Sequence, residues 1–202
     1  MRVSYNVDAK SSKSQNATLL ASSLREHQET LEALIATQLT EIERAGDMIC
    51  EALASGKKVL LCGNGGSAAD AQHIAAELVG RYEKQRRSWP AIALTTDTSA
   101  LTAVSNDFGF EQVFARQVAG LAQAGDVLVA ISTSGKSKNV LNAVEKARGI
   151  GCLIIALTGM TAEPLESICD LTVAVPSIRT ARVQEAHITI GHLWCEMVDR
   201  LE

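Results

Sequence analysis

Six consecutive residues, Ser132-Thr133-Ser134-Gly135-Lys136-Ser137, combine four hydroxyl groups with a glycine and a lysine. They follow a wholly apolar run and open a segment with helical spacing. Hydroxyls and the free backbone N–H groups of a helix N-terminus form a donor-rich nest for a phosphate, to which Lys136 adds positive charge. The alternative is a Ser/Thr-rich turn capped by Ser137. So many hydroxyls in one short loop favour a phosphomonoester site that needs no magnesium.

A second loop, Cys62-Gly63-Asn64-Gly65-Gly66-Ser67, also lies between an apolar run and a helical segment. Its three glycines let the backbone turn tightly and approach a ligand closely, while Ser67 can cap the following helix. The loop is not a dinucleotide fingerprint, because position 68 is Ala, and it is not a P-loop, because no Gly-Lys-Ser/Thr follows. An ordinary tight turn and a ligand-binding loop fit this segment equally well.

Histidines and carboxylates supply candidates for acid–base or metal chemistry. His73 and Glu77 are spaced i, i+4 in the helix after the glycine-rich loop, so both lie on one face. A second group lies in the last helical segment and comprises Gln184, Glu185, His187 and His192. A His/Glu pair beside a ligand loop can bind a metal or act as acid and base, and spacing alone does not choose between these.

The second group meets a geometric objection. Gln184 and His192 are eight residues apart, which is about 12 Å along a straight helix. They can share one ion only if Gln184 lies at the helix start and leans forward, or if they come from different subunits. On spacing alone His187 is a rival for either role. A lone helical histidine, such as His27 in the N-terminal region, is more often structural or solvated.

Short apolar runs alternate with helical segments from residue 58 onward. Strands are predicted at 58–62, 91–94, 126–131, 152–157 and 171–175, and helices at 67–79, 99–104, 111–121, 137–148 and 181–201. This order predicts a three-layer α/β sandwich, with a five-stranded parallel sheet of the flavodoxin-like kind between helices. Ligands bind beyond the carboxyl ends of the strands in such sheets, which is where both loops lie.

The N-terminal region has a different character. Residues 1–17 are polar and rich in Ser, Lys and Asn, and we expect a flexible tail. Residues 17–53 carry apolar side chains at helical spacing and predict two helices, or one long bent helix. So much helix before the first strand needs a surface to pack on, and a neighbouring subunit is a natural candidate. Residues 18–202 are therefore expected to form one domain whose first helices mediate oligomerisation.

Composition excludes several classes of protein. Hydrophobic residues make up 47% and aromatic residues 3%, so the core consists of Ala, Val, Leu and Ile. The net charge of −4, with no block of Lys and Arg, argues against nucleic-acid binding. Five widely spaced cysteines without a Cys-x-x-Cys pair argue against disulfides and cysteine-bound zinc, and fit the cytoplasm. No signal-like or membrane-spanning run is recognised, and no membrane association is expected.

Residues 62–73, with Glu77 and Gly80-Arg81, resemble the phosphoheptose isomerase (sedoheptulose 7-phosphate isomerase) family. Residues 106–110, 132–137 and 183–187 match the same family in order, and this ordered set is specific. The resemblance implies a sugar-isomerase (SIS) domain and a homotetramer with active sites between subunits. It also implies conversion of sedoheptulose 7-phosphate to D-glycero-D-manno-heptose 7-phosphate through an enediol, the first step of ADP-heptose synthesis for lipopolysaccharide.

The resemblance implies roles for individual residues. Glu77 matches the catalytic base and His192 the catalytic acid. The residues that match zinc ligands, for one zinc per active site, are His73, Glu77, Gln184 and His192. The residues that match sugar-phosphate contacts are Asn64, Gly65, Gly66, Ser67, Glu77, Asn106, Asp107, Ser132, Thr133, Ser134, Ser137 and Gln184.

One position departs from the family, and two alternatives stay open. Some members carry an Asp three residues before the matching Gln, where this chain has Ala181, so Thr180 is left to replace a proton relay in part.

Some relatives are non-catalytic scaffolds that bind a replication-initiator protein and lack the Glu and the final His. The presence of Glu77 and His192 favours the enzyme. An isomerase for another sugar phosphate is the third interpretation, because chain-length selectivity depends on pocket shape.

Overall fold

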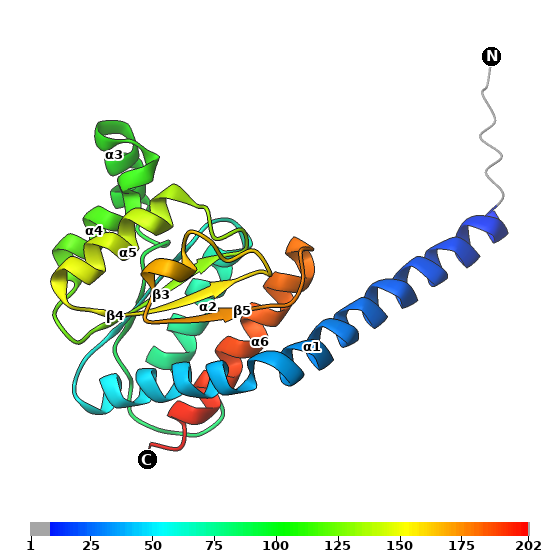
Figure 1. The fold of residues 1–202 in the computed structure, drawn as a ribbon, viewed down its shortest axis with the longest axis horizontal. Coiled ribbons are helices and arrows are strands. Elements are labelled where there is room, and N and C mark those ends of the chain that lie inside the picture. Colours follow the sequence, from blue (N-terminus) through cyan, green and yellow to red (C-terminus); the bar gives the residue numbers. More distant parts are fainter. Residues whose placement is uncertain (1–8, 202) are drawn as a thin grey trace.

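A computed structural model describes residues 9–201, which form a parallel sheet between layers of helices (Figure 1). The strands are β1 (Val59–Gly63), β2 (Ala91–Ala93), β3 (Val127–Ser132), β4 (Leu153–Thr158) and β5 (Leu171–Ala174). Their order in the sheet is β2-β1-β3-β4-β5, and every neighbouring pair is parallel. The predicted five-stranded sheet of the flavodoxin-like kind is confirmed.

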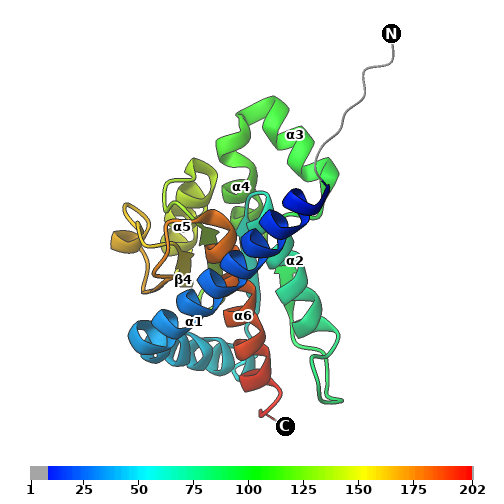
Figure 2. The same cartoon turned by 90° about the vertical axis from the view of Figure 1, so that its right-hand side faces the viewer.

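Helices cover both faces of this sheet. They are α1 (Ala9–Ala54), α2 (Gly66–Val79), α3 (Thr98–Phe108), α4 (Val113–Leu121), α5 (Lys138–Ile150) and α6 (Thr180–Val198), with short turns η1 (Phe110–Gln112) and η2 (Glu166–Ile168). Alternate side chains of a strand point to opposite faces. Leu61 and Val129 therefore pack against α1, α2 and α6, whereas Leu60 and Leu128 pack against α4 and α5. Figure 2 shows the same layers from the side.

The central strands run one residue further than their apolar runs predict. β1 ends at Gly63, β3 at Ser132 and β4 at Thr158. The backbone ladder continues through these residues, because Gly63 pairs with Ile131 and Ser132 pairs with Thr158. Hydrogen bonding of the backbone does not depend on side-chain polarity. Each ligand loop is therefore anchored at its first residue by the sheet.

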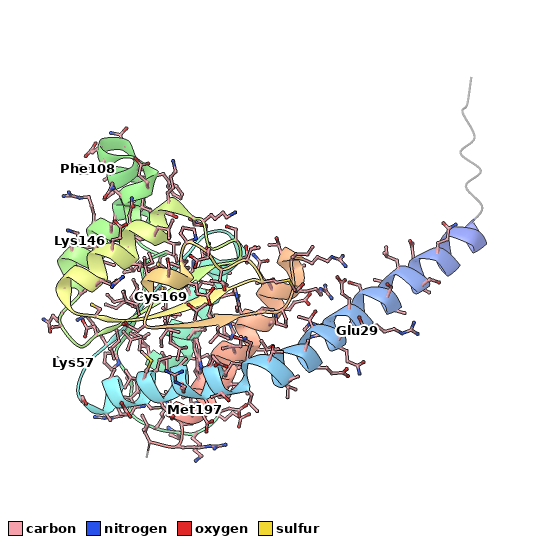
Figure 3. The ribbon with its side chains drawn as sticks, viewed as in Figure 1. Glu29, Lys57, Phe108, Lys146, Cys169 and Met197 are labelled. Atoms are coloured by element: carbon pink, nitrogen blue, oxygen red, sulfur yellow. The ribbon has the colours of Figure 1, made fainter. Side chains whose placement is uncertain are left out.

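Helix α1 is one continuous helix, as in the second of the two predicted alternatives, and it begins at Ala9 rather than near Ala17. Residues 1–8 of the expected tail lie outside the described residues. The second half of α1 packs on α6 and β5 and buries Leu34, Ile42 and Ile49. Its first half, which carries Glu29 in Figure 3, projects away from the sheet. Within residues 9–201, no helix is both long and apolar enough to cross a membrane.

Candidate active site

The two predicted ligand loops leave neighbouring strands, β1 and β3, at the point where the chain order in the sheet reverses. The glycine-rich loop (residues 63–66) leads into α2 on one face, and the serine loop (residues 132–137) leads to α5 on the other face. Loops that diverge in this way open a crevice at the carboxyl edge of the sheet, where doubly wound proteins bind ligands. The fold thus places both loops at one edge.

A pair of amide side chains joins the two loops. Asn64 Nδ2 donates to Asn139 Oδ1 at 2.9 Å, and Asn139 Nδ2 donates back to Asn64 Oδ1 at 2.8 Å. Asn139 lies in the first turn of α5 and is 3% exposed. The glycine-rich loop is therefore tied to the first turn of α5, directly after the serine loop, and the two loops are held at a fixed separation.

The serine loop has the shape of an anion site. Gly135 has φ 66°, and a Cβ there would lie 2.3 Å from the carbonyl oxygen of Ala162, so this turn requires glycine. Ser132 and Ser137 share a hydrogen bond of 3.0 Å between their hydroxyls. Ser137 is the N-cap residue of α5, but its side chain makes no capping bond. The first N–H groups of α5 consequently receive no bond from the Ser137 side chain and are left for another acceptor, as a phosphate site requires.

The glycine-rich loop differs in part from its prediction. The N-cap residue of α2 is Gly65, with φ 57°, and Ser67 lies inside the helix and is 3% exposed, so the predicted capping role of Ser67 is wrong. Ser67 instead packs under Gly63, where a Cβ would lie 2.7 Å from Ser67 Cβ. A Cβ on Gly66 would lie 2.3 Å from Gln184 Nε2. Gln184 therefore lies directly against the start of α2.

His73, Glu77 and His192 form a cluster between α2 and α6. His73 Nε2 lies 2.9 Å from His192 Nε2, and Glu77 Oε1 lies 3.5 Å from His73 Nε2. The close packing of the helices allows this contact, because a Cβ on Gly191 would lie 2.5 Å from Ile74 Cδ1. The cluster brings together a carboxylate and two imidazoles, which are groups that transfer protons or bind a metal.

Gln184 lies apart from this cluster within one chain. It contacts Gly66, which is two helical turns before His73 and so about 10 Å away along α2. The objection raised by its spacing from His192 is therefore confirmed for a single chain. His187 is not a rival, because it is 0% exposed and donates from Nε2 to the carbonyl oxygen of Thr158 at 3.0 Å.

Asn106 and Asp107 lie at the exposed end of α3, where Asn106 Nδ2 donates to Asp107 Oδ1 at 2.8 Å. Within residues 9–201, no hydrogen bond joins them to either ligand loop. The segment that follows them does reach the glycine-rich loop, since Phe110 lines a cavity of 150 Å³ together with Asn64 and Gly65. Asn106 and Asp107 thus flank the site of their own chain without entering it.

Known proteins share this fold and much of this chain's sequence. The SIS domain family matches residues 24–159. A phosphoheptose isomerase of a Nitratiruptor species is 58% identical over 176 residues, or 87% of this chain and 94% of that protein. The chain belongs to the phosphoheptose isomerase family. The family and the SIS fold predicted from the motifs are both confirmed, and these relatives are named as isomerases.

Solved structures of the family agree. The phosphoheptose isomerase of Neisseria gonorrhoeae has a TM-score of 0.87 at 42% identity, covering 91% of this chain and 98% of its own. The phosphoheptose isomerase of Francisella tularensis has a TM-score of 0.89 at 37% identity, covering 92% and 98%. Coverage at this level means that this member of the family has the whole fold of its relatives.

The chemistry of the cluster fits zinc in donor type. Imidazole nitrogen and carboxylate oxygen are common zinc ligands, and His73 and His192 already point their Nε2 atoms at each other. Among residues 9–201, no three His, Cys, Asp or Glu side chains surround one metal position as they stand. The Glu77 carboxylate would have to turn toward the two imidazoles. Gln184, which lies against Gly66, would be the fourth donor only after leaning forward along α2 or from a neighbouring subunit.

The sequence analysis did not identify two further residues that lie at this site. Tyr82 stacks on His192, with ring centroids 5.4 Å apart and an interplanar angle of 30°. Asp70 lies one turn before His73 on α2, and burial raises its pKa to about 6, although the His73 charge opposes the rise. Asp70 lies within the family motif, and Tyr82 directly follows Gly80-Arg81. Nothing in their spacing alone separates them from ordinary surface residues.

The cysteines take no part in the site. All five cysteines are free thiols in the structure. Burial raises the pKa of Cys62 and of Cys195 to about 12. Because the thiolate is the nucleophile and the metal ligand, thiols with such a high pKa are inert near neutral pH.

Buried His187 should make stability depend on pH. Burial lowers its pKa to about 4, against the opposing effect of its hydrogen bond to Thr158, whereas an unfolded histidine has a pKa of about 6.5. Between these two values the unfolded chain takes up a proton that the folded chain does not. Stability therefore falls as pH falls through this window, by up to about 3 kcal/mol.

His187→Gln tests this effect, because glutamine keeps an N–H donor for Thr158 but does not titrate. The variant should lose the part of the pH dependence that wild type shows between about pH 7 and about pH 4.5. Urea unfolding across this range measures it. If wild type and variant lose stability in parallel, His187 is not the responsible group.

Proposed function

We propose that this chain converts sedoheptulose 7-phosphate to D-glycero-D-manno-heptose 7-phosphate, the first step of ADP-heptose synthesis for lipopolysaccharide, in the cytoplasm. The observation that carries the proposal is the cluster of His73, Glu77 and His192 between α2 and α6. The loop at the start of α2 is tied by Asn64 to Asn139, just after the serine loop. Its relationship to enzymes named phosphoheptose isomerase supports the same activity.

In this mechanism the serine loop holds the phosphate, with Ser132, Thr133, Ser134 and Ser137 as hydroxyl donors. Glu77 removes a proton from carbon 1, which lies beside the carbonyl carbon, and an enediol forms. Glu77 then returns the proton to carbon 2. His192 gives a proton to the carbonyl oxygen and recovers one from the hydroxyl on carbon 1, so that ketose becomes aldose with no net gain or loss of protons.

Zinc is the proposed cofactor, one per active site. His73, Glu77 and His192 would hold it, with Gln184 as the fourth donor, either after its side chain leans forward from Gly66 or from a neighbouring subunit. A bound zinc supplies a positive charge that polarises the substrate carbonyl. If Glu77 binds the metal through one oxygen, its other oxygen must stay free to accept the substrate proton. Metal analysis of purified protein, followed by chelation and readdition of zinc, tests the cofactor.

The decisive experiment is an assay of purified protein with sedoheptulose 7-phosphate, with and without added zinc. Formation of the heptose 7-phosphate aldose supports the proposal. A parallel assay with shorter sugar phosphates tests the alternative substrate, since the family relationship does not fix chain length. Tight binding of sugar phosphate without any isomerisation would contradict the proposed activity.

We also propose a homotetramer with active sites between subunits. The first half of α1 exposes Leu19, Leu20 and Leu24 by 64–70% while projecting from its own domain. Exposed leucines on one helix are typical of a surface that another subunit covers. In such an assembly, the binding partners of Asn106 and Asp107 would come from a neighbouring subunit.

Leu20→Glu/Leu24→Glu should dissociate the tetramer, because burying two carboxylates between subunits is unfavourable. Light scattering at micromolar concentration should show a smaller species with unchanged helix content by circular dichroism. Leu121→Glu, at an exposed leucine on α4, is the matched control and should remain tetrameric. A wild-type monomer would contradict the proposed assembly.

A further inference from the structure

A buried ion pair joins the segment after α2 to the end of α6. Arg86 Nε donates to Asp199 Oδ1 at 2.6 Å, and the two side chains are 1% and 5% exposed. Asp199 Oδ2 accepts from the backbone N–H groups of Glu83 and Lys84, both at 2.9 Å. Asp199 therefore holds both the arginine and the backbone of the loop of residues 80–88.

The same arginine caps the helix that carries Glu77. Arg86 Nη2 donates to the carbonyl oxygen of Glu77 at 2.9 Å, and Nη1 donates to that of Leu78 at 3.0 Å. Carbonyl groups in the last turn of a helix lack partners within the helix, and one guanidinium here satisfies two of them. The backbone of Glu77 is thereby connected to Asp199 through a single side chain.

The loop also reaches the other side of the cluster. It carries Tyr82, whose ring stacks on His192. Tyr82 directly precedes Glu83 and Lys84, whose backbone N–H groups donate to Asp199. Asp199 itself follows His192 by seven residues, about two turns further along the same helical segment. The ion pair thus restrains the backbone of Glu77 through Arg86. It also restrains the Tyr82 ring that stacks on His192, through the loop backbone that Asp199 holds.

We propose that Arg86 and Asp199 are positioning residues for the isomerisation, setting how the Glu77 carboxylate faces His192. The inference rests on the proposed function, since it concerns the same site. One base must serve two neighbouring carbons, and misplacement by about 1 Å can lower a rate about a hundredfold. Hydrogen bonds from Lys84, Arg86 and Glu83 hold the pKa of Asp199 below its usual range against the effect of burial, so the ion pair persists at working pH.

Loss of stability alone cannot test this role, because breaking any buried ion pair destabilises a protein. The chain offers a matched control in Asp126, which is 2% exposed and pairs with Lys58 Nζ at 2.5 Å. Asp126 also accepts from two backbone N–H groups, those of Lys58 and Gln123. It precedes β3 and so lies at the edge of the sheet opposite the ligand loops.

Asp199→Asn and Asp126→Asn should both lower the melting temperature. Only Asp199→Asn should lower kcat, by at least about tenfold per folded molecule. Its KM should stay within about threefold, because the serine loop lies in the α5 layer on the other face. Arg86→Lys should lower kcat in the same way as Asp199→Asn, since an ammonium cannot reach all the acceptors of the guanidinium. Equal kcat in the folded Asp199→Asn variant and wild type would overturn the inference.

An independent readout does not require activity. The imidazole signals of His192, assigned by their loss in His192→Gln, report the ring current of Tyr82 in ¹H–¹³C NMR spectra. They should move in Asp199→Asn and in Tyr82→Leu, and should not move in Asp126→Asn. If wild type fails to isomerise the sugar but these shifts appear, the proposed function is wrong and the positioning contact stands. Unmoved His192 signals in Asp199→Asn refute the contact itself.

Discussion

Replacing Glu77 with Gln is expected to lower turnover of sedoheptulose 7-phosphate by at least about a hundredfold, the lower end of what a general base contributes. Glutamine keeps the size and hydrogen-bonding reach of the side chain but cannot accept the substrate proton. Glu77 is half-buried beside His73 and is the carboxylate of the cluster between α2 and α6. His192 contacts the same Nε2 atom of His73, at 2.9 Å, so the proposed base and the proposed acid share one neighbour.

Solvent deuterium incorporation beside the carbonyl measures the proton transfer directly. Wild type should introduce deuterium at that carbon, and Glu77→Gln should not. The variant should still be protected against heat by substrate, because the serine loop is intact. Glu83→Gln, at an exposed glutamate in the following loop, controls for the loss of one negative charge. If Glu77→Gln exchanges at the wild-type rate, the base is another group, and His192 becomes the first candidate.

The fold could be predicted because its signals are local. Apolar runs such as 127–131 are buried on both faces and separated by helical segments, and this pattern admits few arrangements other than a covered parallel sheet. The site edge followed from the same reasoning, since parallel strands end at a common edge. The strand ends were placed one residue early because a polar residue such as Ser132 still joins the backbone ladder.

The choice between His187 and His192 shows what local signals leave open. Residues five apart on a helix point about 140° away from each other, so only one of the two can face α2. Which one does depends on how α6 is rotated against the sheet. In the structure, His187 is buried against the end of β4, and His192 faces His73.

Contacts between distant segments could not be predicted from spacing. Gln184 meets Gly66 while His192 meets His73, because α2 and α6 run side by side in the same direction. The register between two helices more than a hundred residues apart in the chain has no signature in either helix. The pairing of Asn64 with Asn139 is of the same kind, since each is an ordinary polar residue until the strands bring the two loops together.

Replacing Ser132 and Ser134 together with Ala is expected to raise KM for the sugar phosphate by at least about a hundredfold, since each of the two lost hydrogen bonds to a charged group contributes about 1.5–3 kcal/mol. kcat should change little, because the cluster of Glu77 and His192 is built by α2 and α6 rather than by this loop. The fold should persist, since Gly135 still fits against Ala162 and Gly159 N–H still donates to Thr133.

Isothermal titration with substrate and with inorganic phosphate separates the contribution of this loop from that of the sugar. Both ligands should lose affinity in the double variant if the loop holds the phosphate. Ser55→Ala, at an exposed serine after α1, should leave both affinities unchanged. If the double variant binds inorganic phosphate as wild type does, the phosphate lies elsewhere. The N-terminus of α2 at Gly65 would then be the next place to examine, because it also presents free N–H groups at the same edge of the sheet.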